Sequence, residues 1–191
     1  AEICRQRGKK MMFWGDIIRH YPKLIKSIPK DVAVGDWGYN DNPKRYKMVS
    51  DFRKAGLPFY VCPGTSSWCS LFPRIPEARG NIAGFALAAK KNGAMGLLNT
   101  DWGDGGHPNF MEYSWHGYLF GAEQAWNTAA DVPGFTSRFT RLFLGTQDAS
   151  LARAIDRLGE ISYTRVRYLY QSYWYHVFFA RAGDKALSYK A

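Results

Sequence analysis

The sequence predicts an α/β protein built from four strand–helix units followed by further helices. Two observations predict this class: short apolar runs alternate with amphipathic segments, and each run ends in a cluster of Gly, Asp, Trp or Pro. With 191 residues the chain is shorter than the ~250 residues of a complete (β/α)8 TIM barrel. We therefore expect half of such a barrel in residues 1–132 and a helical extension packed on it in residues 133–191, with a flavodoxin-like sheet as the alternative.

The four predicted strands are short and continuously apolar, as is typical of parallel strands that are buried on both faces. They cover residues 10–16, 31–37, 57–64 and 94–102. Apolar residues at helical spacing predict the helices. These cover residues 17–27, 43–55, 75–92 and 113–128, followed by 135–144, 150–158 and 162–179 in the extension. Gly56 should end the second of these helices.

The charge of the chain would suit a nucleic-acid binder, since the net charge is +10 and the pI is about 9.6. Its distribution argues against that function. Lys and Arg occur at helix-like intervals throughout the chain and form no run or stripe, which favours solvated helix faces. We therefore expect no nucleic-acid partner. A nucleic-acid binder remains as an alternative, and it would bind with a steep salt dependence.

The cysteines indicate a reducing compartment. Cys4, Cys62 and Cys69 form no CxxC pair, and an odd count gives no disulfide framework. The longest apolar stretch, around Ile82–Ala89, is too short to cross a bilayer, and the first ten residues contain no apolar core of a signal peptide. These features favour a cytoplasmic location without fixing it, and we expect no membrane partner.

Aromatic and acidic residues lie where the predicted strands end, which is where a βα barrel carries its functional groups. The first strand ends in Trp14-Gly15-Asp16, the second in Asp36-Trp37, and the fourth in Trp102-Gly103-Asp104, while Tyr60 lies on the third. A barrel interior prefers branched aliphatic residues, so repeated Trp at strand ends needs another explanation. Aromatic faces stack on pyranose rings and carboxylates accept hydrogen bonds from hydroxyls, so the pattern predicts a carbohydrate pocket.

This pattern resembles the catalytic barrel of the family 20 glycoside hydrolases, the β-N-acetylhexosaminidases. That family has a Trp at the ends of strands five and six, a Tyr on strand seven and a Trp-x-acid motif at strand eight. The matching residues are, in order, Trp14, Trp37, Tyr60 and Trp102-Gly103-Asp104. The stretches YVCPGTSSW and LNTDWGDGGH, and a Glu followed by Trp three residues later at Glu123–Trp126, are also similar to the family. The resemblance covers about residues 10–130 and implies the C-terminal half of the barrel.

The resemblance also implies roles for these residues. The three Trp would wall the pocket of a terminal N-acetylhexosamine. Asp16 is a further candidate for substrate binding because of its position at the end of the first strand. Tyr60 would donate its hydroxyl to the acetamido oxygen while the substrate's own amide attacks the anomeric carbon, in a retaining, substrate-assisted reaction. Asp104 would bind distal hydroxyls where the family usually has Glu. Cys62 stands where many members have an Asp that assists the Tyr.

The general-acid pair of the family is missing from this chain. The family carries an adjacent Asp-Glu pair at the end of strand four, and no Asp-Glu dipeptide occurs here. Glycoside hydrolysis needs a proton donor at the leaving oxygen. We therefore expect part of an exo-β-N-acetylhexosaminidase that supplies the sugar-binding wall and is inactive alone. The alternative is a non-catalytic carbohydrate-binding half-barrel.

Two further residues are candidates for substrate binding. Trp68 lies on the loop after the third strand, and such loops carry specificity. His107 follows a glycine-rich turn and could contact substrate. Asp101, Asp104 and His107 do not suffice to assign a metal, and the glycine-rich turn lacks the Lys and the Ser or Thr of a phosphate-binding loop, so no metal or other cofactor is expected.

An open half-barrel would expose unpaired strand edges and an apolar, aromatic inner face. Such surfaces rarely stay uncovered in a stable protein. We therefore expect the chain either to associate with itself or to bind the polypeptide that carries the N-terminal half of the barrel.

Overall fold

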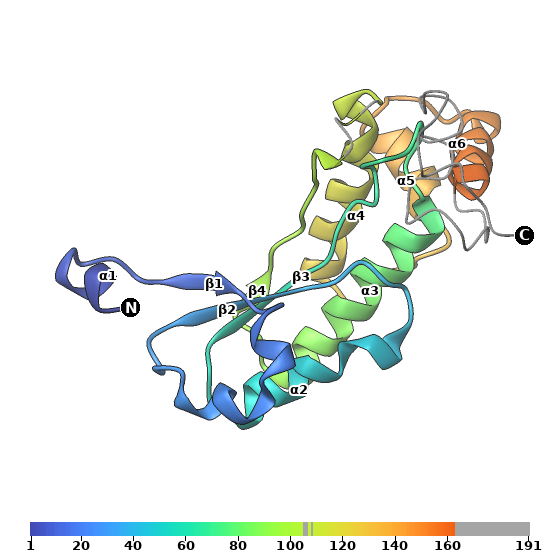
Figure 1. Ribbon diagram of the computed structural model, residues 1–191. Coiled ribbons are helices and arrows are strands. Elements are labelled where there is room, and N and C mark those ends of the chain that lie inside the picture. Colours follow the sequence, from blue (N-terminus) through green and yellow to red (C-terminus); the bar gives the residue numbers. More distant parts are fainter. Residues whose placement is uncertain (105–106, 108, 163–191) are drawn as a thin grey trace, which may run out of the picture. The chain divides into compact units, whose positions relative to one another are not determined.

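The computed structural model describes residues 1–104, 107 and 109–162 (Figure 1). They form two compact units, each assembled from several segments of the chain. The first unit comprises Ala1–Gly64, Gly80–Thr100 and Gly121–Ala130, and the second comprises the described residues of Thr65–Arg79, Asp101–Phe120 and 131–162. The division into residues 1–132 and 133–191 that the sequence predicts stays a prediction.

The first unit contains a four-stranded parallel sheet, which confirms the α/β class. Its strands are β1 (Met12–Trp14), β2 (Ala33–Trp37), β3 (Phe59–Cys62) and β4 (Gly96–Leu97). They lie in the order β1-β2-β3-β4, and each pairs in parallel with the next. This sequential order differs from the 2-1-3-4-5 order of a flavodoxin-like sheet, so the structural alternative is not supported. The strands are shorter than predicted, because their ends continue as loops.

One face of this sheet packs against helices. Val34 of β2 and the alternate β3 residues Phe59 and Val61 contact Phe52 of α2 (Lys47–Lys54) and Phe85 of α3 (Ile75–Asn92). All five side chains are at most 2% exposed. Because side chains alternate between the faces of a strand, the intervening residues of β1 to β4 lie on the other face. The core of the first unit is therefore on one side of the sheet.

The helices of this unit largely follow the sequence pattern. Helix α3 begins and ends where predicted, and Gly56 ends the region of α2 with a φ of +65°. The segment predicted as a helix over residues 17–27 instead forms two 3-10 turns, Ile18–His20 and Pro22–Ser27. Pro22 has no N–H to continue a helix, so the segment breaks there. A short helix, α1 (Glu2–Gln6), and a 3-10 turn, Pro43–Tyr46, complete the unit.

The second unit is mainly helical. It contains the beginnings of α3 and of α4 (Ser114–Trp126), together with α5 (Phe135–Leu142) and α6 (Ala149–Ser162), which pack on each other. A 3-10 turn, Met111–Tyr113, precedes α4. These positions agree with the predicted helices 113–128, 135–144 and 150–158. The predicted helix 162–179 lies outside the described residues beyond Ser162.

A buried polar network connects the helices of the second unit. The His116 ring nitrogen Nε2 lies 3.0 Å from the hydroxyl of Thr136, which donates to the Asp156 carboxylate at 2.7 Å. Arg79 also donates to Thr136 and forms an ion pair with Asp156. Because the Thr136 proton is directed at Asp156, the His116 Nε2 must carry a proton and donate it. Burial, reinforced by the charge of Arg79, lowers the pKa of His116 to about 3.

We predict that acidification destabilises the protein through His116. Its imidazole titrates near 6.5 in the unfolded chain and near 3 when folded, so below pH 6.5 the unfolded state binds the additional proton. The contribution of the neutral ring is complete above pH 6.5 and is lost as the pH falls toward 3. Between pH 7 and pH 5 the unfolding free energy should drop by about 2 kcal/mol from this group. Urea unfolding at a series of pH values measures it.

The control is His116→Gln, whose amide can still donate to Thr136 but does not titrate. Its stability should fall less steeply between pH 7 and pH 5 than that of the parent chain. If the unfolding free energies of the two proteins changed equally with pH, His116 would be protonated at its ordinary pKa in the folded state.

Candidate functional site

Aromatic rings in the first unit lie over glycines on the sheet face opposite the core. Trp14, Gly35, Tyr60 and Gly96 are cross-strand partners in one row across the sheet. A Cβ placed on Gly35 would lie 2.8 Å from Cε3 of the Trp14 ring, and one on Gly96 would lie 3.4 Å from Cε1 of Tyr60. The two glycines thus provide the room that lets the rings lie along the sheet. Trp14 remains 38% exposed.

Trp37 at the end of β2 is held by a cation and a second ring. It stacks on Tyr39 with 5.3 Å between ring centroids and an interplanar angle of 21°. The Arg19 guanidinium lies 5.6 Å from the centroid of the Trp37 ring and also binds the Trp37 carbonyl and the Asp36 carboxylate. Asp36 is 2% exposed, and burial raises its pKa although Arg19 opposes that shift. Asp36 and Arg19 therefore position Trp37.

Asn81 of α3 fixes the loops that follow β2 and β3. It is completely buried, and its amide nitrogen donates to the carbonyls of Gly38 at 2.8 Å and Asn40 at 3.0 Å. Its amide oxygen accepts the N–H of Gly64 at 3.0 Å. The sequence analysis missed this residue, because a lone Asn inside a helix gives no signal of the loops it contacts.

Cys62 introduces no charge near Tyr60. Its side chain is buried, and burial together with the nearby Asp36 carboxylate raises the pKa of the thiol to about 12. The thiol is therefore neutral at physiological pH and contacts the Tyr60 carbonyl at 3.9 Å. Asp16, which follows β1, is half-buried.

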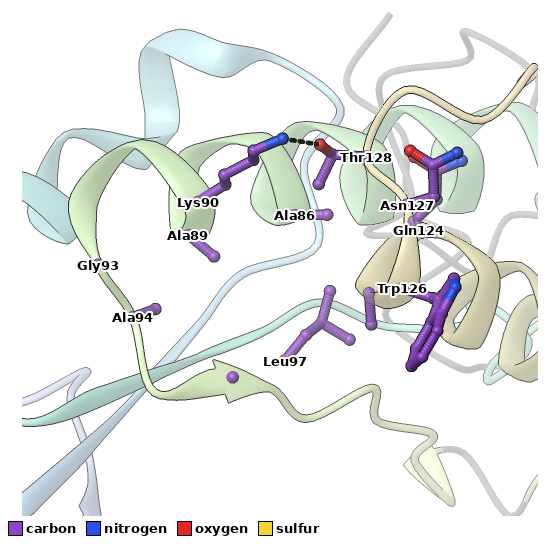
Figure 2. A pocket seen from close by; sticks show the side chains of 12 residues that line it. Ala86, Ala89, Lys90, Gly93, Ala94, Leu97, Gln124, Trp126, Asn127 and Thr128 are labelled. Atoms are coloured by element: carbon purple, nitrogen blue, oxygen red, sulfur yellow. Dashed lines mark hydrogen bonds between the residues drawn. The ribbon is translucent and has the colours of Figure 1, made fainter.

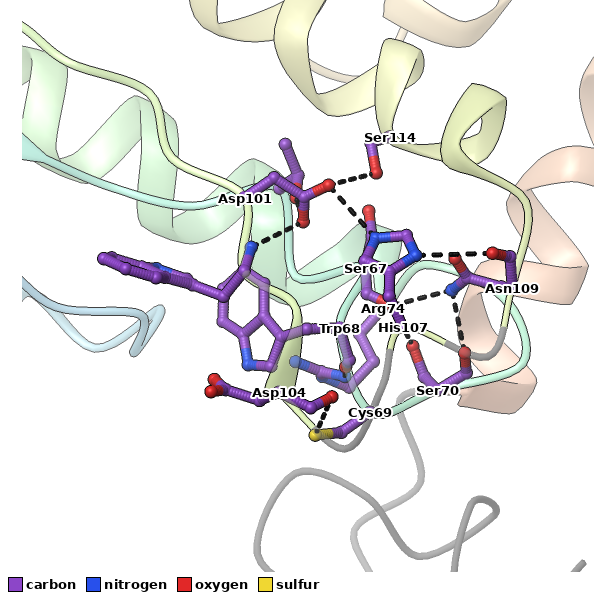
Figure 3. Close-up of polar contacts among 12 residues, drawn as sticks. Ser67, Trp68, Cys69, Ser70, Arg74, Asp101, Asp104, His107, Asn109 and Ser114 are labelled. Atoms are coloured by element: carbon purple, nitrogen blue, oxygen red, sulfur yellow. Dashed lines mark hydrogen bonds and ion pairs between the residues drawn. The ribbon is translucent and has the colours of Figure 1, made fainter. Parts of the chain in front are cut away.

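In the second unit, the Asp101 carboxylate accepts three hydrogen bonds and faces the His107 ring (Figure 3). Its Oδ1 accepts from the Thr65 hydroxyl at 2.8 Å and the Trp102 N–H at 3.0 Å. Its Oδ2 accepts from the Ser114 hydroxyl at 2.6 Å and lies 3.2 Å from Nε2 of His107. The Asp101 side chain is only 4% exposed. This carboxylate therefore connects the beginning of α4 to the loops that contain Thr65 and His107.

His107 has an acceptor at each ring nitrogen. Nε2 faces Asp101, and Nδ1 lies 3.3 Å from the carbonyl of Asn109. The residue has a φ of +49°, a left-handed conformation that side chains rarely adopt. The Asn109 amide in turn donates to the carbonyls of Ser67 and Ser70, both at 2.7 Å (Figure 3). These contacts orient the imidazole within the second unit.

Trp68 is enclosed by a buried ion pair. Its side chain is 2% exposed, and the Arg74 guanidinium lies 5.4 Å from the ring centroid and donates to the Trp68 carbonyl at 2.8 Å. Arg74 also pairs with Glu77 at 3.0 Å. The structure thus places this predicted substrate contact inside the second unit.

Trp102 and Asp104 lie on the loop after Asp101. Trp102 is half-buried and Asp104 is exposed, while the Asp104 carbonyl accepts a hydrogen bond from the Cys69 thiol at 2.9 Å. Burial, followed by the charge of Asp104, raises the pKa of this thiol. The predicted residues therefore separate into a first-unit set, Trp14, Asp16, Trp37 and Tyr60, and a second-unit set, Trp68, Trp102, Asp104 and His107.

Neither similarity to known proteins nor another type of site assigns a function to this chain. No protein-family model matches the chain, and no curated protein matches it with significance. Within residues 1–104, 107 and 109–162 there is no group of three or more His, Cys, Asp or Glu side chains arranged to hold a metal ion. In the same part of the chain, the helices are too short or too polar to cross a membrane.

We predict that Asp101→Asn destabilises the protein by about 2–3 kcal/mol, because the new amide NH2 would face donors that the carboxylate now satisfies. Urea unfolding measures the change. The matched control is Asp51→Asn on α2, where an exposed carboxylate lies 3.8 Å from Lys54 and the loss should stay within about 0.5 kcal/mol. Equal effects of the two substitutions would contradict the structural role of Asp101.

Proposed function

We propose that this chain is part of an exo-β-N-acetylhexosaminidase, a glycoside hydrolase that removes a terminal N-acetylhexosamine. The observation that carries the proposal is the sheet face on which Trp14 and Tyr60 lie in one cross-strand row over Gly35 and Gly96. Trp14 ends β1 and Tyr60 lies within β3, so the row offers flat rings on one face of the sheet, and α/β folds bind their ligands at the carboxyl ends of such strands. Sugars stack on rings of this kind through their apolar faces.

The sheet topology supports half of a (β/α)8 barrel as the architecture. A barrel requires sequential parallel strands, with helices on one face and the other face turned inward. The first unit has sequential strands and a helix-packed core on one face of the sheet. On the proposed barrel, the opposite face with Trp14 and Tyr60 would be the interior. The helical segments of residues 133–191 would be the extension.

The proposal gives the site residues the roles that the family resemblance implies. In the first unit, Trp14 and Trp37 bind the sugar ring and its acetamido group, and the Tyr60 hydroxyl donates to the acetamido oxygen. That oxygen becomes more charged as it attacks the anomeric carbon, so a donor aimed at it stabilises the transition state more than the bound substrate.

The remaining candidates would contact substrate hydroxyls or neighbouring sugar units. They are Asp16, Asp104 and His107, whereas Trp68 is 2% exposed and has no face open to a sugar.

The neutral Cys62 thiol bears on how Tyr60 would act. A carboxylate at this position would act through its negative charge on the Tyr60 hydroxyl or on the acetamido group. A thiol with a pKa of about 12 adds no negative charge. Tyr60 would therefore act by its hydrogen bond alone. The acetamido group would therefore be polarised less than in a site that has the carboxylate.

A non-catalytic carbohydrate-binding half-barrel is the second candidate. It is favoured by the absence of an Asp-Glu dipeptide from the 191 residues, since the reaction needs a general acid. Under the first proposal, that acid comes from another polypeptide or another part of the protein. Under the second, the aromatic face binds sugar and no turnover occurs in any assembly.

We predict that the 191-residue chain associates and does not hydrolyse a chromogenic N-acetyl-β-glucosaminide. An exposed strand edge and an uncovered aromatic face favour association, and a missing general acid removes about 10²–10⁴ in rate. Size-exclusion chromatography with light scattering gives the mass, and the same fractions are assayed. A stable 21.7 kDa monomer would contradict the association, and turnover by it would contradict the missing acid.

We also predict the effect of Tyr60→Phe in an active assembly with a polypeptide that restores the N-terminal half-barrel. The value of kcat should fall about 10-fold to 1000-fold with little change in KM, because the hydroxyl acts mainly in the transition state. Tyr39→Phe, which keeps the ring beside Trp37, is the control. An effect confined to KM would rule out this role for Tyr60, and an active assembly that never forms would favour the binding half-barrel.

A further inference from the structure

Two cavities in the described part of the chain differ in the chemistry of their walls. The cavity beside α3, β4 and the end of α4 is lined largely by Ala and Gly residues, beside which Lys90 and Trp126 are exposed (Figure 2). Such a lining does not indicate what would bind there. The other cavity belongs entirely to the second unit, has a volume of about 340 Å³ and is almost wholly apolar.

Aromatic rings from three parts of the second unit form this apolar cavity, which we call the aromatic groove. They come from the residues before α3, from the region where α4 begins, and from α5 with the residue that follows it. The Trp115 and Phe143 rings pack with 4.9 Å between their centroids, and the Phe72 and Tyr113 rings with 5.0 Å. The aromatic lining residues are Phe72, Tyr113, Trp115, Phe139 and Phe143.

The aromatic groove leaves apolar surface exposed. Trp115 is 46% exposed, Phe143 is 41% exposed, and Leu144, which also lines the groove, is 46% exposed. Proteins rarely leave a contiguous apolar patch uncovered, because removing such surface from water is favourable. The occupant of the groove must therefore bring apolar groups of its own.

Helix α6 brings the end of the described chain close to this groove. Ile155 of α6 lines the groove, and Gly159, one turn later, packs on Ile75, which also lines it. A Cβ placed on Gly159 would lie 2.6 Å from the Cβ of Ile75. Ser162, the last residue of α6, lies about 4.5 Å further along the helix axis. Residues 163–191 therefore begin at a point from which a few residues of chain can reach the groove.

The sequence of residues 163–179 suits this groove. Eight of these seventeen residues are Phe, Trp or Tyr. They also include Arg165 and Arg167 and no Asp or Glu, whereas the acidic residue among the described lining residues is the exposed Glu112. The segment thus offers apolar rings and a charge opposite to that of the groove.

The covalent link favours this segment over a second molecule as the occupant. A short tether gives a segment an effective concentration on the order of 1 mM at a nearby surface. A segment from another copy of the chain would compete only at protein concentrations of that order.

We propose that residues 163–179 of the same chain occupy the aromatic groove of the second unit. Their aromatic side chains cover Trp115 and Phe143, and Arg165 or Arg167 pairs with Glu112. The C-terminal segment is then part of the core of the second unit. This role does not depend on sugar binding by the first unit, so it goes beyond the proposed hydrolase activity.

Photo-crosslinking in the complete 191-residue chain identifies the occupant. Trp115→p-benzoylphenylalanine places a photoreactive ring in the groove, and equal amounts of ¹⁴N- and ¹⁵N-labelled chains are mixed before irradiation. We expect crosslinks to residues 163–179 that join peptides of the same isotope. The control is Leu151→p-benzoylphenylalanine on α6, an exposed position that does not line the groove and should give at least about tenfold fewer such crosslinks.

Two results of this experiment would overturn the proposal. Crosslinks that join ¹⁴N peptides to ¹⁵N peptides would assign the groove to a second copy of the chain. No crosslinks from Trp115→p-benzoylphenylalanine to residues 163–179 would show that this segment does not occupy the groove.

A double-mutant cycle tests which face of the segment contacts the groove. The helical spacing of Tyr170, Tyr173 and Val177 predicts one apolar face, with Tyr175 on the opposite side. Phe143→Ala and Tyr173→Ala together should lower the urea midpoint by less than the sum of the single shifts, with a difference of about 0.3 M or more, because either change alone removes their contact. Tyr175→Ala and Phe143→Ala should be additive. Phe143 is 41% exposed, so its change should permit folding, which circular dichroism checks. Additive shifts in both cycles would overturn the proposal.

Discussion

The geometry of the first unit depends on how one buried amide, that of Asn81, satisfies the backbone at the ends of two strands. Loops after β2 and β3 leave backbone groups without ladder partners, and burying such groups unpaired would be costly. Asn81 is completely buried and meets three of them, at Gly38, Asn40 and Gly64. The loop that follows Trp37 is therefore held by α3, and the aromatic residues at the strand ends have a rigid support.

In the second unit, the charged carboxylate of Asp101 satisfies donors of neighbouring segments in a similar way. Its carboxylate accepts from two hydroxyls and one backbone N–H and faces His107, so its four contacts come from three segments of the chain. A buried carboxylate is tolerated when it is hydrogen-bonded in this way. The consequence for function is that Asp101 and His107 first serve to organise the loop that contains Trp102 and Asp104. Any contact of His107 with a ligand must compete with its two present partners.

The sequence predicted the elements better than their connections. The helical spacing of apolar residues predicted both ends of α3, and Gly56 predicted the end of α2. Both signals are local in the sequence. The predicted strands were too long, because an apolar run does not show at which residue the backbone hydrogen bonds of the sheet end. The sequence did not predict that Gly35 and Gly96 pair with Trp14 and Tyr60, because this row exists only in the register of the sheet.

The sequence predicts the residue types of the candidate site and not their arrangement. The position of His107 after a glycine-rich turn predicts a substrate contact, and Asp101, Asp104 and His107 did not suffice to assign a metal. The position of Thr65 and Ser114 around Asp101 depends on contacts over 36 and 13 residues, which a motif does not encode.

The aromatic content of 16% illustrates why composition alone could not decide the function. In the second unit, Phe135 and Phe139 pack around His116, and Trp68 lies against Arg74, so these rings build the interior. Other rings remain exposed in both units: Trp14 and Trp126 are 38% and 94% exposed in the first unit, and Trp115 is 46% exposed in the second. A ring that is needed for packing gains little from exposure, because burial of its apolar surface is what stabilises the fold. The exposure of each ring, and not the total count, therefore separates rings available at the surface from rings that build the interior.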